Sequence, residues 1–142
     1  MLAVILFPNI TYANTQSHDV TISAVDILDV YDVDINWDNM QFTYIEQEKY
    51  VYDNEKHLYN RNVINYWTSN SNNIKIMNES KKNINVNLKY NKINSNVSGT
   101  FNKNNFDIRV NEAQNIKLNL YGNIDNSYTV FKTVGEVSIV IS

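Results

Sequence analysis

The chain of 142 residues contains no cysteine, and it has only three glycines and one proline. The absence of cysteine excludes disulfide bonds, cysteine-ligated metal centres and a thiol nucleophile. With so few glycines and prolines, other residues must form the turns. Asparagine is abundant, and it tolerates a left-handed backbone and caps its own turns. A chain of this length predicts one domain that can build its own hydrophobic core.

The chain also has no cluster of basic residues, since its 12 lysines and arginines are scattered and the formal net charge is −3. A nucleic-acid-binding surface needs such a cluster, so we expect no nucleic-acid partner. No apolar run approaches the roughly 20 residues that a membrane-spanning helix requires. The sequence therefore predicts a mature protein without a stable membrane span.

Residues 1–13 have features of a secretion signal. The apolar run Leu2–Phe7 is followed by Pro8, and Thr11-Tyr12-Ala13 has the small-x-small pattern of a cleavage site. No basic residue precedes the apolar run, which makes the signal partial, and an ordinary buried first strand is the alternative. We expect cleavage after Ala13 and a mature domain of residues 14–142 that is secreted or associated with the cell surface.

Short segments in which apolar and polar residues alternate run through the rest of the chain. The clearest is Ile84–Tyr90, where Ile84, Val86, Leu88 and Tyr90 share one face. Such alternation is typical of strands with one buried face, and no window has a helical period. Further strands are expected at residues 19–25, 33–37, 40–44, 73–77, 97–101, 106–110, 116–121 and 137–141. The sequence predicts an all-β fold, a single immunoglobulin-like antiparallel β-sandwich of about 8–9 strands.

The segment Asp34–Tyr44 predicts the centre of this sandwich, because Trp37, Phe42 and Tyr44 are large and lie among alternating polar residues. Trp37 is expected to fill the core. Residues 46–66 read as a polar, tyrosine-rich hairpin or long loop, residues 69–73 as a turn, and residues 78–83 as a hairpin connection.

Several motifs follow one another along the chain in a characteristic order. They are Asp34-Ile-Asn-Trp37, Met40-Gln-Phe-Thr-Tyr44, Trp67, Asn78-Glu-Ser80, Ser98-Gly-Thr-Phe101, Leu118-Asn-Leu-Tyr-Gly122 and Val134-Gly-Glu-Val-Ser-Ile-Val-Ile141. In this order they resemble a family of small exported proteins of Firmicutes with a Trp-x-x-Met-x-Phe-Thr-Tyr motif and a C-terminal Val-Gly-x-Val-x-Ile-x-Ile strand. The resemblance implies export and an immunoglobulin-like sandwich, and it implies no catalytic residue.

Two patterns were weighed as sites of chemistry. Asp32, Asp34, Asn36 and Asp38 have the spacing of calcium ligands, but a calcium loop of that class needs Gly and Glu where Trp37 and Thr43 stand. We therefore expect no metal and treat these four residues as weak candidates. For hydrolysis, His18 falls in an expected disordered start and His57 in the tyrosine-rich segment, and no nucleophile elbow or zinc-binding helix is present. Glu46, Glu48, Asp53 and Glu55 read as a solvated face, so we expect neither an enzyme nor a cofactor.

The aromatic residues of the tyrosine-rich segment are the better binding candidates. Aromatic rings with polar tips give contact area at low entropic cost, as binding surfaces require. The candidates are Tyr50, Tyr52, Tyr59, Tyr66 and Trp67. Covering the core is the alternative role for these rings.

Sheet edges are the other feature that predicts contacts. The segment Asn14–Val25 and the C-terminal strand could each lie at an edge and pair with another chain. We therefore expect an exported, non-enzymatic surface or matrix protein that contacts itself or another surface protein in adhesion or assembly. The alternative is a small glycan- or cell-wall-binding module that uses the loop of residues 50–67.

Overall fold

The computed structural model describes residues 10–124 and 132–142, and these residues form strands and no helix. The strands are β1 (Ile10–Ile27), β2 (Val33–Trp37), β3 (Gln41–Asp53), β4 (Leu58–Ser71), β5 (Asn73–Asn78), β6 (Ile84–Lys92), β7 (Ser98–Phe101), β8 (Asn105–Ile108), β9 (Ala113–Tyr121) and β10 (Thr133–Ile141). The all-β prediction is confirmed, with ten strands in these ranges rather than eight or nine. Within the described part of the chain no helix is long and apolar enough to cross a membrane.

The strands form two sheets that pack as a sandwich. The larger sheet has the order β4-β3-β1-β10-β6-β8, and the smaller has the order β2-β5-β9-β7. The predicted antiparallel pairing holds for the neighbouring strands except β1 and β10, which run parallel. The sequence did not reveal this parallel pair, because alternation identifies the buried face of a strand but not its direction relative to a neighbour.

The core consists of the inward-facing residues that the alternation predicted. In β6 these are Ile84, Val86 and Leu88, which are buried between the two sheets. The corresponding buried residues are Ile116, Leu118 and Leu120 in β9, Val137, Ile139 and Ile141 in β10, and Met40, Phe42 and Tyr44 at the start of β3. Full burial of one such aliphatic side chain stabilises a fold by about 1.5–3 kcal/mol, so these rows account for the attraction between the sheets.

Tyr90 is enclosed by two of the three glycines. A Cβ at Gly99 would lie 2.5 Å from Cδ2 of Tyr90, and a Cβ at Gly135 would overlap the phenol oxygen. The hydroxyl of Tyr90 donates a hydrogen bond of 3.2 Å to the backbone oxygen of Val134. Burial raises the pKa of Tyr90 to about 12. The glycines at 99 and 135 are therefore required by the approach of this ring to two backbones.

Two predicted connections are wrong. The expected turn at 69–73 is mostly strand, since β4 continues to Ser71 and β5 begins at Asn73. The segment after β5 is not a hairpin connection, because β5 and β6 belong to different sheets. The buried side chain of Asn78 shapes this crossing by donating hydrogen bonds to the backbone oxygens of Lys82 (2.8 Å) and Ile108 (3.0 Å).

The predicted sheet edges also differ from the observed ones. The C-terminal strand β10 lies between β1 and β6, so the prediction of an edge there is wrong. In β1 the residues from Asp19 onward pair with β10, whereas Ile10–Asp19 pair with β3. The outermost strands of the described sheets are β4 and β8 in the larger and β2 and β7 in the smaller.

Candidate functional site

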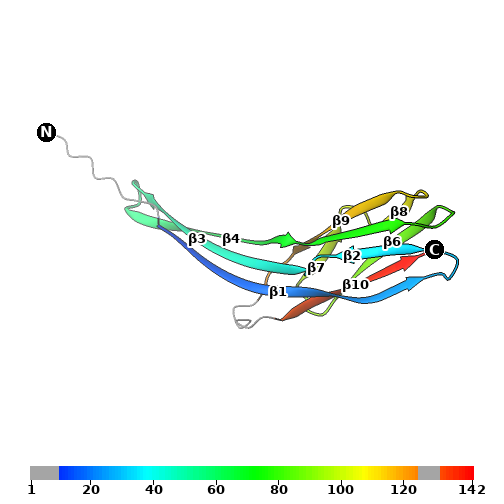
Figure 1. Cartoon of the computed structure of the whole chain (residues 1–142). Coiled ribbons are helices and arrows are strands. Elements are labelled where there is room, and N and C mark those ends of the chain that lie inside the picture. Colours follow the sequence, from blue (N-terminus) through cyan, green and yellow to red (C-terminus); the bar gives the residue numbers. More distant parts are fainter. Residues whose placement is uncertain (1–9, 125–131) are drawn as a thin grey trace.

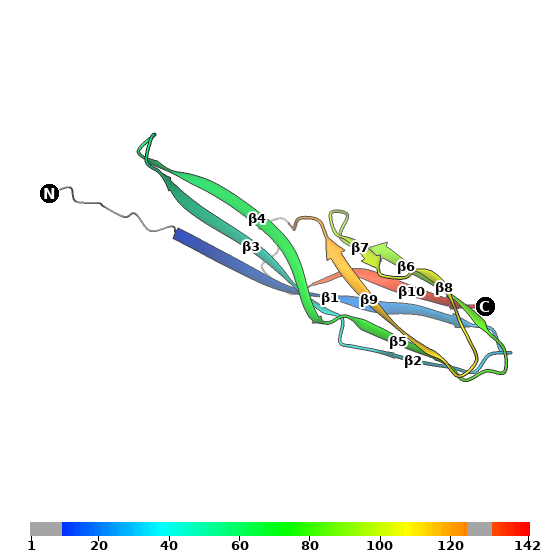
Figure 2. The ribbon, with the colours of Figure 1, turned by 90° about the horizontal axis from the view of Figure 1, so that it is seen from above.

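Three strands continue far beyond the sandwich and form a separate arm. Figures 1 and 2 show β3, β4 and the first half of β1 extending away from the other strands, while the C-terminus lies at the opposite end of the molecule. We define the arm as residues 10–18, 44–53 and 58–67, and the body as the remaining strands. The first four residues of the arm, Ile10–Ala13, pair with residues 47–50 of β3. They belong to the predicted signal of residues 1–13, of which residues 1–9 lie outside the described part.

Trp67 connects the base of the arm to the body. Its ring contacts Tyr44 and His18, with ring centroids 5.1 and 5.8 Å away. Its Nε1 donates a hydrogen bond of 2.9 Å to the backbone oxygen of Gly122, just after β9. Trp67, one of the predicted binding residues, is therefore partly buried and has a structural role.

His18 is fully buried in this base, so its expected place in a disordered start is wrong. The backbone N–H of Lys132 donates to its Nδ1 at 3.2 Å, and its Nε2 lies 3.4 Å from Oε1 of Gln16. An Nδ1 that accepts a hydrogen bond holds no proton. Burial lowers the pKa of His18 below its ordinary value of 6.5, and the charge of Asp19 opposes this shift only in part. The base of the arm therefore contains the neutral imidazole of His18.

The predicted tyrosine site is divided between the two faces of the arm. Pairing of β3 with β4 places Tyr50, Tyr52 and Tyr59 on the face that continues the core, whereas Tyr66 lies on the opposite face. Tyr52 and Tyr59 form an edge-to-face pair with centroids 5.2 Å apart, and Tyr50 forms another with Tyr12 at 5.9 Å. These rings contact one another and do not form one flat platform.

Three charged residues of the arm, Glu48, Asp53 and Arg61, have structural partners. Arg61 forms an ion pair with Glu48, which also accepts a hydrogen bond of 3.2 Å from the hydroxyl of Tyr50. The hydrogen bond from Arg61 lowers the pKa of Glu48. Asp53 caps the turn between β3 and β4 by accepting from the backbone N–H groups of Glu55 (2.9 Å) and Lys56 (3.2 Å), and these bonds lower its pKa. Two of the acids weighed for acid–base chemistry thus stabilise a hairpin.

Apolar residues are exposed on both faces of the arm, and most of them are not among the binding residues predicted from the sequence. Ile64 is 54% exposed, and Tyr12 is 59% exposed. Leu58, Val63 and Tyr66 are exposed as well. Along residues 58–66 apolar side chains occur on both faces of the strand. A strand with one face against a core would instead alternate apolar and polar residues.

The outer edge of the arm is formed by β4. This strand pairs with β3 on one side and is the last strand of its sheet. Exposed edges in soluble proteins usually carry lysines, proline or a bulge that prevents pairing with other chains. β4 has no proline and one charged residue, Arg61, which is already paired with Glu48. Within the arm the edge therefore lacks these protections.

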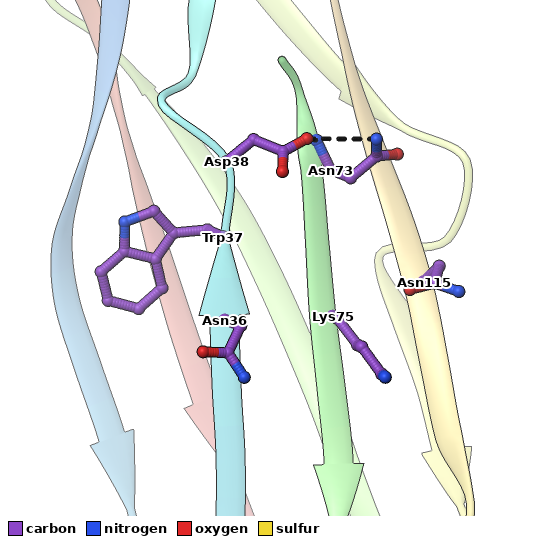
Figure 3. Close-up of a pocket in the computed structure, with 6 residues that line it drawn as sticks. All are labelled: Asn36, Trp37, Asp38, Asn73, Lys75 and Asn115. Atoms are coloured by element: carbon purple, nitrogen blue, oxygen red, sulfur yellow. Dashed lines mark hydrogen bonds between the residues drawn. The ribbon is translucent and has the colours of Figure 1, made fainter. Parts of the chain in front are cut away.

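Trp37 lies at a second exposed position, on the body. The alternation of β2 predicted a core residue, but the Trp37 side chain is 48% exposed, so this prediction is wrong. The physical reason is that β2 is an outer strand, and no described strand lies beyond it to cover the indole. Val33 and Ile35 of the same strand do pack partly against the core. In Figure 3 the indole extends toward β1 and away from Lys75 and Asn115.

Two shallow hollows adjoin Trp37. One of about 500 Å³ is lined by Asn36, Trp37, Asp38, Asn73, Lys75 and Asn115, and it lies over β2, β5 and β9 (Figure 3). There Oδ2 of Asp38 accepts hydrogen bonds from the backbone N–H (3.0 Å) and the side-chain amide (3.2 Å) of Asn73. The other, of about 410 Å³, is lined by Trp37, Asp38 and residues of β1 such as Thr21. An exposed ring therefore stands beside a fixed carboxylate and several amides.

The weak calcium candidates are not gathered into one site. Nδ2 of Asn36 donates to Oδ2 of Asp34 at 3.0 Å on the outer face of β2, and Asp38 is bonded to Asn73. Asp32 is connected through its backbone to the hydroxyl of Ser80. Among the residues that the structure describes, no three His, Cys, Asp or Glu side chains lie together in a way that could hold a metal.

The chain matches no protein-family model, and no curated protein or solved structure is significantly similar to it. The function is therefore inferred from the geometry of the arm and from the surroundings of Trp37.

Proposed function

We propose that this chain is an exported, non-enzymatic bacterial protein that acts at the cell surface or in a matrix through protein–protein contacts, and that the arm makes these contacts. The observation that carries the proposal is a three-stranded sheet outside the sandwich with exposed apolar side chains on both faces. Isolated sheets of this kind gain stability when a partner covers them. A role in adhesion or assembly fits this geometry.

The kind of partner follows from the chemistry of the arm. An open edge offers backbone N–H and C=O groups in the spacing of a strand, and another polypeptide strand satisfies them in register. The neighbouring apolar residues, Leu58, Ile64 and Tyr66, supply contact area on the same strand. Together the two features favour protein over any smaller ligand.

The second candidate function is glycan binding. The structure lends little support to a glycan site in the loop of residues 50–67. The ring of Tyr52 contacts that of Tyr59, and the ring of Tyr50 contacts that of Tyr12, so these rings form no flat platform for a sugar. Trp37 is the feature that favours this candidate, since its ring is half exposed and Asp38 and the amide of Asn73 lie beside it. Sugars bind to such combinations of one apolar ring and a few fixed polar groups.

Binding to bacterial cells separates the two candidates. The full chain is labelled with a fluorophore and added to intact cells, cells treated with protease, and cells presented with excess soluble wall polysaccharide. If the arm binds protein, protease treatment abolishes binding and Ile64→Glu lowers it at least tenfold. Ile93→Glu is the matched control, because Ile93 is also 54% exposed but lies outside the arm. Binding that survives protease, resists Ile64→Glu, and is lost on Trp37→Ala or with polysaccharide would overturn the proposal in favour of the glycan candidate.

A further inference from the structure

The outer edge of β4, residues 58–66, has the features of a surface that pairs with an identical copy of itself. Every one of these residues is exposed. The inner edge of β4 already forms its backbone hydrogen bonds with β3, so its outer edge is the one that faces a partner. We propose that two copies of the chain pair through this edge as antiparallel strands, with a twofold axis beside Asn62, so that two arms form one six-stranded sheet. This pairing rests on the proposed role of the arm and names its partner.

Symmetry restricts how the two edges can meet. Residues that face each other across antiparallel strands project from the same face of the sheet. In a twofold antiparallel pair, the residue numbers of any two facing residues therefore have the same sum. That sum is even, because both residues project from the same face, so one residue lies on the axis and faces its own copy. With Asn62 on the axis, the whole exposed stretch from Leu58 to Tyr66 is used. The strand cannot slide further toward the body without meeting Trp67, which is tied to Gly122.

This register also matches the side chains. Leu58 of one copy faces Tyr66 of the other, and each apolar pair occurs twice by symmetry. Asn60 faces Ile64 on the same face of the sheet, while Arg61 faces Val63 on the other face. Cross-strand pairs of an aromatic and an aliphatic side chain stabilise neighbouring strands. The two Leu58–Tyr66 pairs would thus lie at the two ends of the contact, with the polar pair of Asn62 side chains at its centre.

Charge favours a second copy over a charged partner. Arg61 is the one charged residue of β4, and Glu48 of its own chain neutralises it. Two such edges can approach without like-charge repulsion, whereas a strongly charged strand would find no counter-charges along β4. Antiparallel pairing also places the two bodies at opposite ends of the shared sheet, because β4 runs from the tip of the arm toward the body of its own chain (Figure 2).

The first half of β1 is the competing edge, and it is less suitable. Its residues 10–18 contain no charge, but at Asp19 the strand enters the pairing with β10, and the backbone N–H of Asp19 donates to Lys132. A partner strand on this side would meet β10 at the base of the arm. Along the arm, no strand in the described part of the chain pairs with the outer edge of β4.

Because the chain has no cysteine, single cysteines give an unambiguous test. Facing residues of antiparallel strands have Cα atoms about 4.5–5.5 Å apart, within the range of about 4.4–6.8 Å that a disulfide spans. Under mild oxidation Asn62→Cys should form a disulfide dimer, and a mixture of Asn60→Cys and Ile64→Cys should crosslink far better than either alone. Asn70→Cys is the matched control, an exposed asparagine of β4 outside the proposed contact. Equal crosslinking at Asn70, or preferential crosslinking of Asn62→Cys with Thr15→Cys of β1, overturns the pairing.

Charge complementation tests the same register without oxidation. Asn62→Lys places two lysines on the axis and Asn62→Glu two glutamates, so each variant alone should dimerise about tenfold more weakly than the original chain. An equimolar mixture should recover the dimer mass in light scattering over a hundredfold range of concentration. A monomer at every concentration, in the original chain and in the mixture, overturns self-pairing. Protease-sensitive cell binding that Ile64→Glu abolishes would in that case still support the protein-contact role of the arm.

Discussion

The indole Nε1 of Trp67 donates a hydrogen bond of 2.9 Å to the backbone oxygen of Gly122, so that the base of the arm is tied to the end of β9. Gly122 has a φ of +104°, and a Cβ at this residue would overlap the backbone oxygen of Asn96. The glycine is therefore needed for the turn that presents its carbonyl to Trp67. Besides the shared core, this contact joins the larger sheet, which contains the arm, to the end of a strand of the smaller sheet.

Trp67→Phe should weaken that link while keeping a large ring beside Tyr44. We expect the free energy of unfolding to fall by about 1–2 kcal/mol, because the carbonyl of Gly122 loses its donor and the smaller ring fills less space. Urea unfolding followed by circular dichroism measures the change. Trp37→Phe is the control, since Trp37 is half exposed, and it should change stability by less than about 0.5 kcal/mol. Equal losses for the two variants would contradict the structural role of Trp67.

Gly135→Ala should destabilise the fold by about 1–3 kcal/mol, since the added methyl overlaps the phenol of Tyr90 and forces the ring to move. The effect depends on that ring. In a Tyr90→Leu background the same glycine substitution should cost clearly less, and a double-mutant cycle from thermal or urea unfolding reports the difference. Equal costs in the two backgrounds would show that the overlap with Tyr90 is not the cause.

His18 should make stability depend on pH on the acid side of neutrality. Its pKa in the folded protein lies below 6.5, so the unfolded chain takes up the proton first as the pH falls. Stability should be constant for this group above about pH 6.5 and should decrease below it. His18→Gln keeps an acceptor for the Lys132 N–H and removes the titration, so its stability profile between pH 7 and 5 should be flatter. A profile as steep as that of the original chain would rule out His18 as the source.

Tyr90 should produce the opposite dependence at high pH. Burial raises its pKa to about 12 in the folded protein, whereas an exposed tyrosine ionises near 10. The unfolded chain therefore loses the proton first, and stability should fall between pH 10 and 12. Tyr90→Phe should remove this part of the decline, which urea unfolding at pH 9 and pH 11 measures. Its own stability at pH 9 should be slightly lower, because the hydrogen bond to Val134 is lost.

The sequence predicts the strands of the body well because each has one buried face. The rows Ile84-Val86-Leu88 and Val137-Ile139-Ile141 are periodic, and they are the core of the structure. The all-β sandwich follows from them. The assignment of strands to sheets does not follow, because the crossing after β5 depends in part on the hydrogen bond from Asn78 to the backbone oxygen of Ile108, a distant residue that no local pattern identifies.

The candidate site was harder to predict for the same physical reason. Beyond the base of the arm, where His18 and Tyr44 are buried, neither face is fully buried. Alternation therefore gives no signal of a core there, and residues 46–66 read as a hairpin or a loop. The predicted hairpin is present as β3 and β4, but the sequence pattern did not indicate how long its strands are. Trp37 was predicted in the core because it continues the alternation of Val33 and Ile35, which do face the core. Its exposure depends on β2 being an outer strand, which is a property of the whole sheet. The burial of His18 was missed because β1, the strand that contains it, begins within the presumed signal.

The parallel pairing of β1 with β10 has a mechanical consequence. The start of β1 and the end of β10 lie at opposite ends of the molecule (Figure 1), and the two strands are joined by backbone hydrogen bonds from Asp19 to Ile141. Tension applied between these two ends acts along the strands and loads all of the joining bonds at once, in shear. Bonds loaded together resist more force than bonds that open one after another. A molecule stretched between two such points would thus be held by the hydrogen bonds between β1 and β10.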